Sequence, residues 1–219
     1  MSISLAVSSA GAIPDLDTLT VKAGEWLDRD DIADKIPTFI AMAEALFNRE
    51  LRCPPMERTI TFSAADEDTP LPDDYLAMRG IYVEGTPDQA LRATSPSSTR
   101  QEFNGVAGTP EVYTLVSGGI RLIPPPDADL LLTMDYYAKL IPLTAFAPTN
   151  WLLETHPDAY LYATLFYAEA FLDNATRAAQ WKGLLDQAID SINREARNDR
   201  YGAGPISRST IGQTCGGRC

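Results

Sequence analysis

Histidine and cysteine, the side chains that most often ligate transition metals or form a nucleophile with its base, are nearly missing from this chain. Its 219 residues include one histidine, His156, and three cysteines. Cys53 stands alone, and Cys215 and Cys219 lie in a glycine-rich tail, so their spacing fits no zinc pattern and we expect free thiols in a reducing compartment. A Ser-His-Asp or Cys-His arrangement would depend on His156 alone, which argues against nucleophilic catalysis.

Long apolar runs and recognisable phosphate-binding loops are also missing. The sequence has no run of 18 apolar residues, which excludes a typical transmembrane helix, and we expect no membrane partner. The first residues lack the positive charge of a signal peptide, which indicates the cytoplasm. Neither GxxxxGK[ST] nor GxGxxG occurs, so no nucleotide cofactor is expected.

Basic residues are few. The chain has 18 Lys and Arg against 30 Asp and Glu, a formal net charge of −12. A nucleic-acid-binding protein needs clustered Lys and Arg to neutralise phosphates, so this balance argues against DNA or RNA binding. The charge balance does not argue against a protein that lies beside DNA without binding it.

One acidic cluster is the only candidate for metal chemistry. A divalent ion could be held there by carboxylate oxygens, but the spacing does not fit an EF-hand loop and solvated loop acids are far commoner. We therefore expect no metal, no cofactor and no catalytic residue. The cluster consists of Asp66, Glu67, Asp68, Asp73 and Asp74.

Apolar residues at helical spacing predict helices at both ends of the chain. Residues 15–28 predict a first helix, and residues 30–52 a second that either kinks at Pro37 or begins there. Residues 150–198 hold the densest apolar periodicity and predict a helical hairpin. Pro157 suits a first helical turn, with Thr155 as its candidate cap, and the short polar side chains of residues 173–176 predict a break between the two helices. Trp181 begins the apolar stripe of the last helix, which we expect to pack on the N-terminal helices around Trp26 and Phe39.

The middle of the chain changes to the period of two that is typical of strands. We expect four to six antiparallel strands forming a small β-domain, either a sandwich or a barrel, while the 63–72 region should be an acidic loop. The expected strands are residues 57–62, 79–84, 111–117, 119–123 and 130–137, with a short one at 89–93.

These elements predict an α+β fold. An N-terminal helical pair and a C-terminal helical hairpin should form a four-helix-type bundle, with the small antiparallel β-domain inserted between them. The last twenty residues contain three arginines and no acid, and we expect an extended basic arm that becomes ordered on a partner. The predicted division is a flexible N-terminus at 1–14, helices at 15–55, the β-domain at 56–145, the hairpin at 146–199 and the arm at 200–219.

Three blocks of the sequence resemble the head-to-tail adaptor, or connector, proteins of tailed bacteriophages. The first is LDTLTVKAGEWLDRDDIADKIPTFIAMAEALFNRELR. The second comprises LPDDYLAMRGIYVEG and GGIRLIPPPDADLLLTMDYYAKLIPLT in the β-region. The third is WLLETHPDAYLYATLFYAEAFLDNATRAAQWKGLLDQAI. The blocks occur in the family's order and cover residues 15 to 195.

The resemblance implies a structural virion protein and not an enzyme. It implies a ring of twelve copies below the portal, at the neck of the virion, assembled in the host cytoplasm. The ring would connect the capsid vertex to tail or tail-completion proteins and would line the DNA exit channel. Genomic DNA would pass without sequence-specific binding, because a ring of negative subunits repels phosphates.

On this interpretation, two sets of residues are candidates for contacts in the assembly. The basic arm should bind acids of the portal protein, and one flank of the last helix should face a neighbouring subunit. The arm residues are Arg200, Tyr201, Ile206, Arg208 and Arg218; the flank residues are Arg177, Lys182, Asp186, Asp190 and Arg194.

Two other classes of function stay open at this point. A soluble helical binding module or assembly chaperone could present the same hairpin without forming a ring. A metal-dependent hydrolase would need the acidic cluster to bind an ion, which a calorimetric titration with divalent cations would detect.

Overall fold

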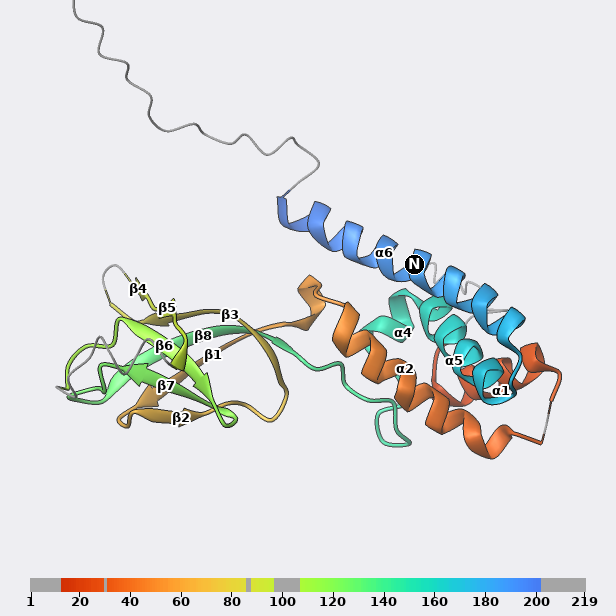
Figure 1. Cartoon of the computed structure of the whole chain (residues 1–219), viewed down its shortest axis with the longest axis horizontal. Helices are drawn as coiled ribbons and strands as arrows, with labels where there is room; N and C mark the ends of the chain where they lie inside the picture. The colour runs from red at the N-terminus through yellow and green to blue at the C-terminus, as the bar shows by residue number, and fades with distance from the viewer. Residues whose placement is uncertain (1–12, 30, 86–87, 97–106, 202–219) are drawn as a thin grey trace, which may run out of the picture.

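The protein consists of a helical half and a β half that lie end to end (Figure 1). The structure, a computed structural model, describes residues 13–29, 31–85, 88–96 and 107–201. The strands occupy residues 57–138, and helices precede and follow them in the sequence. The predicted flexible N-terminus lies almost entirely outside the described residues. Within the described ranges, no helix is both long and apolar enough to span a bilayer.

The N-terminal helices begin and end as their sequences indicate. The Asp15 carboxylate accepts a hydrogen bond from the Thr18 N–H at 2.8 Å and caps α1, which ends at Asp28 in the left-handed conformation with φ 54°. α2 does not begin near residue 30. It starts at Ile36, with Pro37 in its first turn, so the second of the two predicted starts is correct. These elements are α1 (Leu16–Leu27), η1 (Ala33–Lys35), α2 (Ile36–Glu50) and η2 (Pro54–Met56).

The C-terminal helices confirm the hairpin but not its predicted cap. Thr155 does not cap the helix at Pro157, because its hydroxyl donates to the Trp151 carbonyl inside the preceding short helix. The break between the long helices is where the sequence predicts it, with Asp173 at φ 57° and Asn174 before the next helix. The elements are α4 (Trp151–Thr155), α5 (Pro157–Phe171) and α6 (Ala175–Tyr201).

One apolar core joins the helices, and α5 lies at its centre. α5 packs against α6 on one side and against α2 and α1 on the other. The Trp26 and Trp181 ring centroids lie 5.6 Å apart, which confirms the expected contact between the first and last helices. Phe39 instead meets Phe171 of α5. The α+β class is confirmed, while the four-helix-type bundle stays a prediction, because most contacts between the helices run through α5.

In the residues that the structure describes, the β half is built from two four-stranded sheets. One sheet has the order β1-β8-β3-β4 and the other the order β2-β7-β6-β5. All pairs are antiparallel except β5 with β6, which is parallel, so the prediction of a purely antiparallel domain is wrong at that edge. The strands are β1 (Glu57–Ala64), β2 (Asp68–Pro70), β3 (Tyr75–Val83), β4 (Gln89–Ala90), β5 (Arg92–Ala93), β6 (Val112–Val116), β7 (Gly119–Ile123) and β8 (Leu130–Ala138).

A shared core between the two sheets makes the β half a sandwich. On β8, Leu132, Met134 and Tyr136 alternate with exposed or half-buried residues and face the other sheet. Ile120 and Leu122 of β7 contribute from the opposite side. The choice between sandwich and barrel, which the sequence leaves open, is thus decided by the strand order.

Candidate interaction surfaces

A cluster of charged residues joins the end of α6 to the β half. The Arg200 guanidinium donates to a Glu57 carboxylate oxygen, to the Tyr137 hydroxyl at 2.5 Å and to the Arg52 carbonyl at 3.4 Å. Arg79 binds the other oxygen of Glu57. Three guanidinium carbons lie 5.5–5.9 Å from the Tyr137 ring centroid. We call these five residues the junction cluster.

The junction cluster changes the interpretation of the predicted arm. Arg200 lies inside α6 and is bonded within its own chain, and Tyr201 is the last residue of that helix. Burial disfavours the charged guanidinium, yet the hydrogen bonds and charge interactions with Glu57 and Tyr137 together outweigh burial, and the pKa of Arg200 is raised. The segment beyond α6 therefore starts from a fixed point beside the β half. Ile206, Arg208 and Arg218 lie outside the described residues.

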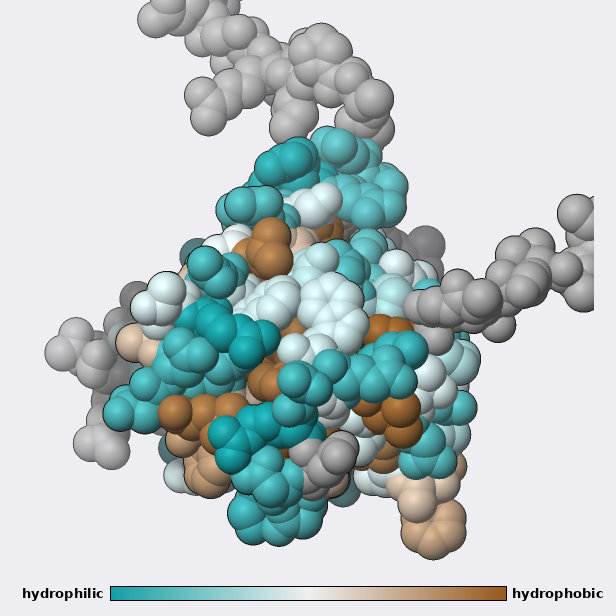
Figure 2. Space-filling view, turned by 90° about the vertical axis from the view of Figure 1, so that its right-hand side faces the viewer, coloured by the Kyte–Doolittle hydropathy of each residue, from teal (hydrophilic) through white to brown (hydrophobic). Residues whose placement is uncertain are grey.

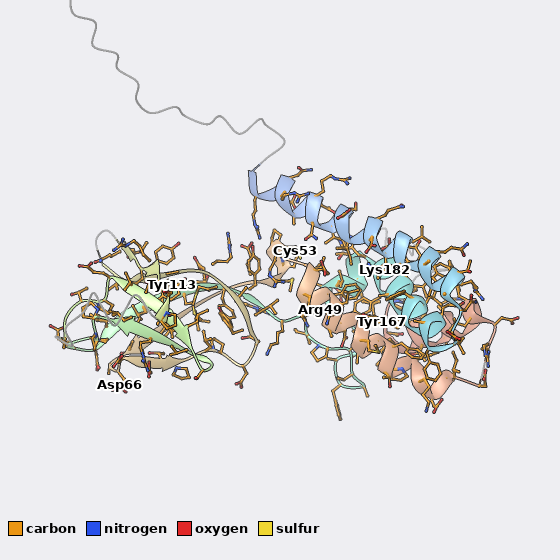
Figure 3. All side chains as sticks on the ribbon, viewed as in Figure 1. Arg49, Cys53, Asp66, Tyr113, Tyr167 and Lys182 are labelled. Carbon is orange, nitrogen blue, oxygen red and sulfur yellow. The ribbon has the colours of Figure 1, made fainter. Side chains whose placement is uncertain are left out.

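The predicted flank of α6 separates into two groups. Lys182, Asp186, Asp190 and Arg194 follow one another at every fourth residue and so lie along one side of α6, where Lys182 pairs with Asp186. Figure 3 shows the position of Lys182 on α6.

Arg177 lies apart from the other four flank residues. Its Nε is 2.9 Å from Oε1 of the buried Glu169, and its guanidinium also donates to the Trp26 carbonyl at 3.3 Å. It thus ties α6 to α5 and α1, and its role in a subunit contact stays a prediction.

The acidic cluster is not gathered into one site. Asp68 binds Arg121 through two hydrogen bonds of 2.7 Å, which hold the pKa of the Asp68 carboxyl below its usual value. Asp74 accepts a bond from the Tyr136 hydroxyl instead, and Asp66 lies at the far tip of the β half (Figure 3). In the part of the chain that the structure describes, no three His, Cys, Asp or Glu side chains are placed to hold a metal ion.

Cys53 and His156 line the same surface hollow near the junction cluster, a proximity that the sequence does not predict. Cys53 is buried, however, and burial raises the pKa of its thiol to about 11. The reactive thiolate is therefore almost absent at neutral pH, and the two residues do not form a nucleophile with its base.

Cys53 should accordingly be unreactive in the folded protein. In a chain carrying Cys215→Ser and Cys219→Ser, we expect Cys53 to react with a disulfide reagent at pH 8 about 100-fold more slowly than in guanidinium chloride, from the fall in thiolate fraction alone. Release of the coloured thiol measures both rates. Equal rates in the folded and unfolded chain would contradict this description of Cys53.

Residues 139–150, which we call the connecting segment, are fixed to α2 and α5 by buried hydrogen bonds. The Leu143 N–H donates to the Glu44 carboxylate at 2.7 Å, and the Leu140 N–H donates to the Asn48 side chain at 2.8 Å. Asn150 donates to the Ile141 carbonyl and to a tyrosine hydroxyl, both at 2.7 Å. No sequence motif marks this network, because its members come from three separate parts of the chain.

Glu44 should make stability depend on pH. Burial raises the pKa of this carboxyl, while the bonds from Leu143 and Tyr160 act in the opposite direction. The native state then binds the proton more tightly than the unfolded chain, so the free energy of unfolding should fall as pH rises from about 4.5 through the raised pKa. Glu44→Gln keeps an acceptor and should remove that fall; urea titrations across this range measure it.

A matched control separates this effect from general titration. Glu50→Gln removes an exposed carboxylate from the same helix and should keep the wild-type fall. Identical pH curves for Glu44→Gln and the wild type would show that Glu44 is not the source.

Among the described residues of the helical half, the exposed apolar side chains include some on the connecting segment and some on α6. The connecting segment carries Phe146, which is 100% exposed, and Ile141, which is 52% exposed. α6 carries a shallow hollow that we call the α6 groove, around Leu184, which is 40% exposed. Figure 2 shows the helical end with apolar residues in separate small areas between hydrophilic ones. The groove is lined by Ala179, Gln180, Trp181, Gly183, Leu184 and Gln187.

Comparison with known proteins gives one family. The model of the family described as SU10 adaptor protein matches residues 14–209, which include all the helices and strands described above. No curated protein matches the chain.

Proposed function

The chain belongs to the SU10 adaptor protein family of phage head-to-tail adaptors, and we propose that it forms a ring of twelve copies between the portal and the tail. The family match over most of the chain is the observation that carries this proposal. In this role the protein is a structural component of the virion neck, bound to the portal on one side and to tail or tail-completion proteins on the other.

The shape of the molecule supports assembly into a closed ring. A ring requires head-to-tail contacts, in which each subunit offers two different complementary surfaces. The helical half and the β half differ in architecture, and they lie end to end (Figure 1). The junction cluster fixes α6 to both halves, which limits bending between them.

The charge distribution supports a channel through which DNA slides. Residues 57–138 contain thirteen Asp and Glu against five Arg, so the β half carries most of the net charge of −12. Where such a surface faces the channel, it repels phosphates and prevents sequence-specific binding. Genomic DNA would then pass without adhering.

The acid-free C-terminal segment is the proposed portal contact. It follows Tyr201, the end of α6, and contains Ile206, Arg208 and Arg218. Arginine binds carboxylates through two parallel hydrogen bonds, so acidic portal residues are suitable partners. Arg200 supports this contact as the fixed base of the segment, because it is itself bonded to Glu57.

Co-sedimentation with purified cognate portal protein tests the ring. The full chain should migrate with the portal, and negative-stain images should show twelve-fold symmetry. If no complex forms, the adaptor function is wrong for this chain. If the chain binds the portal as a monomer and forms no ring, a chaperone or binding module is favoured.

A truncation tests the arm separately. A chain ending at Tyr201 should bind the portal at least about ten-fold more weakly, since several charge-assisted hydrogen bonds are lost. Deletion of residues 1–12 is the matched control and should leave the affinity unchanged. Equal affinity of the truncated and full chains would remove the arm from the portal contact while leaving the ring in place.

A further inference from the structure

Phe146 lies on a hydrogen-bonded backbone turn, where its side chain contributes nothing to the fold. It lies at the tip of a tight turn that is closed by two backbone hydrogen bonds between Thr144 and Ala147, of 2.9 and 3.1 Å. On one side of the turn Leu143 is fixed by Glu44, and on the other the Pro148 carbonyl accepts a bond from the Leu16 N–H at 2.8 Å. The side chain nevertheless stays fully exposed.

An exposed aromatic side chain on an ordered turn is well suited to bind another molecule. A Phe side chain can bury about 150–250 Å², and because the turn is already ordered, little conformational entropy is lost on binding. Ile141, exposed on the same segment, extends the apolar contact. Prolines 142 and 148 flank the turn and restrict the backbone further.

The same chain provides a hollow of matching chemistry. The α6 groove is open at Gly183, where an added Cβ would meet no atom within 4 Å, and Leu184 and Trp181 supply apolar walls. In Figure 1 α6 runs along one edge of the helical half and the connecting segment lies at the opposite edge. One molecule therefore cannot fill its own groove with its own Phe146, but a neighbour can.

Charge at the two surfaces permits a second copy as the occupant. Each copy carries −12, so two copies repel one another wherever acidic surfaces meet. Residues 140–150 contain no charged side chain, and neither do the six residues that line the α6 groove. These two surfaces can meet without burying an unpaired charge, which would oppose association.

We propose that Phe146 of each copy inserts into the α6 groove of the next copy, a head-to-tail contact that closes the adaptor ring. The inference rests on the ring of the proposed function and names the surfaces that join its subunits. Phe146 and Ile141 anchor the interface, and the charged flank of α6 from Lys182 to Arg194 forms its rim. Because opposite edges of each subunit are used, the contact is heterologous, as a ring requires.

Cross-linking between two cysteine variants tests the contact directly. Both are made in the full chain with Cys215→Ser and Cys219→Ser, one with Phe146→Cys and the other with Leu184→Cys. Mixed on the portal and oxidised, they should form a disulfide dimer, whereas each variant alone should not. Leu115→Cys on the β half, an equally exposed apolar position, is the matched control for Leu184→Cys and should give no dimer with Phe146→Cys.

A second measurement does not depend on disulfide geometry. Phe146→Ala should lower the occupancy of rings on the portal at least about ten-fold, with an unchanged circular dichroism spectrum. Val21→Ala, at another exposed apolar position, should leave occupancy unchanged. Subunit association should also strengthen between 50 and 500 mM salt, because salt screens the repulsion between acidic copies.

The outcomes separate this inference from the proposed function. Wild-type rings that tolerate Phe146→Ala and give no mixed dimer would overturn the Phe146 contact and leave the adaptor function intact. A cross-link from Phe146→Cys to the portal protein would also overturn it. If the wild-type chain forms no ring with the portal, the proposed function is wrong, and the Phe146 contact that rests on it is wrong as well.

Discussion

Replacing Phe47 with alanine is expected to lower the free energy of unfolding by about 3–5 kcal/mol, the largest effect of any single substitution argued for this protein. Phe47 lies on α2 with 0% exposure, and its ring centroid is 5.1 Å from that of Tyr160 on α5 in an edge-to-face arrangement. Alanine removes the aromatic contact and leaves a cavity that rigid helices on both sides cannot close. Urea unfolding followed by circular dichroism measures the change.

Phe146→Ala is the matched control for Phe47→Ala, because the chemical change is identical and only the environment differs. Phe146 is fully exposed and should tolerate alanine within about 0.5 kcal/mol. If both variants lost a similar free energy of unfolding, the burial of Phe47 between α2 and α5 would not determine the stability of the helical half. Together the two variants separate a residue that stabilises the fold from one that is available for assembly.

The periodicity of apolar residues predicted most of the helices and strands, because these elements are stabilised by local interactions or by burial of one apolar face. The Gly119–Ile123 strand is predicted to the residue, and the helix break at Asp173 follows from short polar side chains that cap helices. β2 is missed because Asp68–Pro70 has no alternating pattern. Its place in the sheet depends on pairing with β7, about fifty residues away, and on the bond between Asp68 and Arg121.

The interaction surfaces were less predictable than the fold, for a physical reason. A helical wheel identifies charged residues on α6 but cannot show that Arg177 reaches Glu169 and the Trp26 carbonyl, or that Arg200 reaches Glu57. The bonds to Trp26 and Glu57 join segments that are distant in sequence, and the contact with Glu169 crosses the break between α5 and α6, so these contacts exist only after folding. Phe146 could have been noticed as an aromatic in a charge-free, proline-flanked segment, yet its exposure depends on how Glu44 and Asn150 hold that segment.

Replacing Asn150 with alanine is expected to destabilise the protein by about 3 kcal/mol. The side chain is buried, and its oxygen accepts a bond from the Leu153 N–H at 3.0 Å, which caps α4. Loss of a cap costs about 1 kcal/mol, and a partner left unsatisfied adds about 1–3 kcal/mol. That partner is the Ile141 carbonyl, because the Tyr160 hydroxyl keeps its bond to Glu44. Thermal and urea unfolding measure the loss.

Two further variants show which part of Asn150 matters. Asn150→Asp keeps the oxygen that caps α4 but replaces the donor with an acceptor beside the Ile141 carbonyl, so it should be about as destabilising as alanine at pH 7. Thr149→Ala removes only a 3.4 Å bond to Glu154 and should cost less than about 0.5 kcal/mol. If Asn150→Asp had the same free energy of unfolding as the wild type, Asn150 would stabilise the protein only by capping α4. If the donor matters, the same variant should also release the connecting segment, move Phe146 from its fixed position and weaken ring formation.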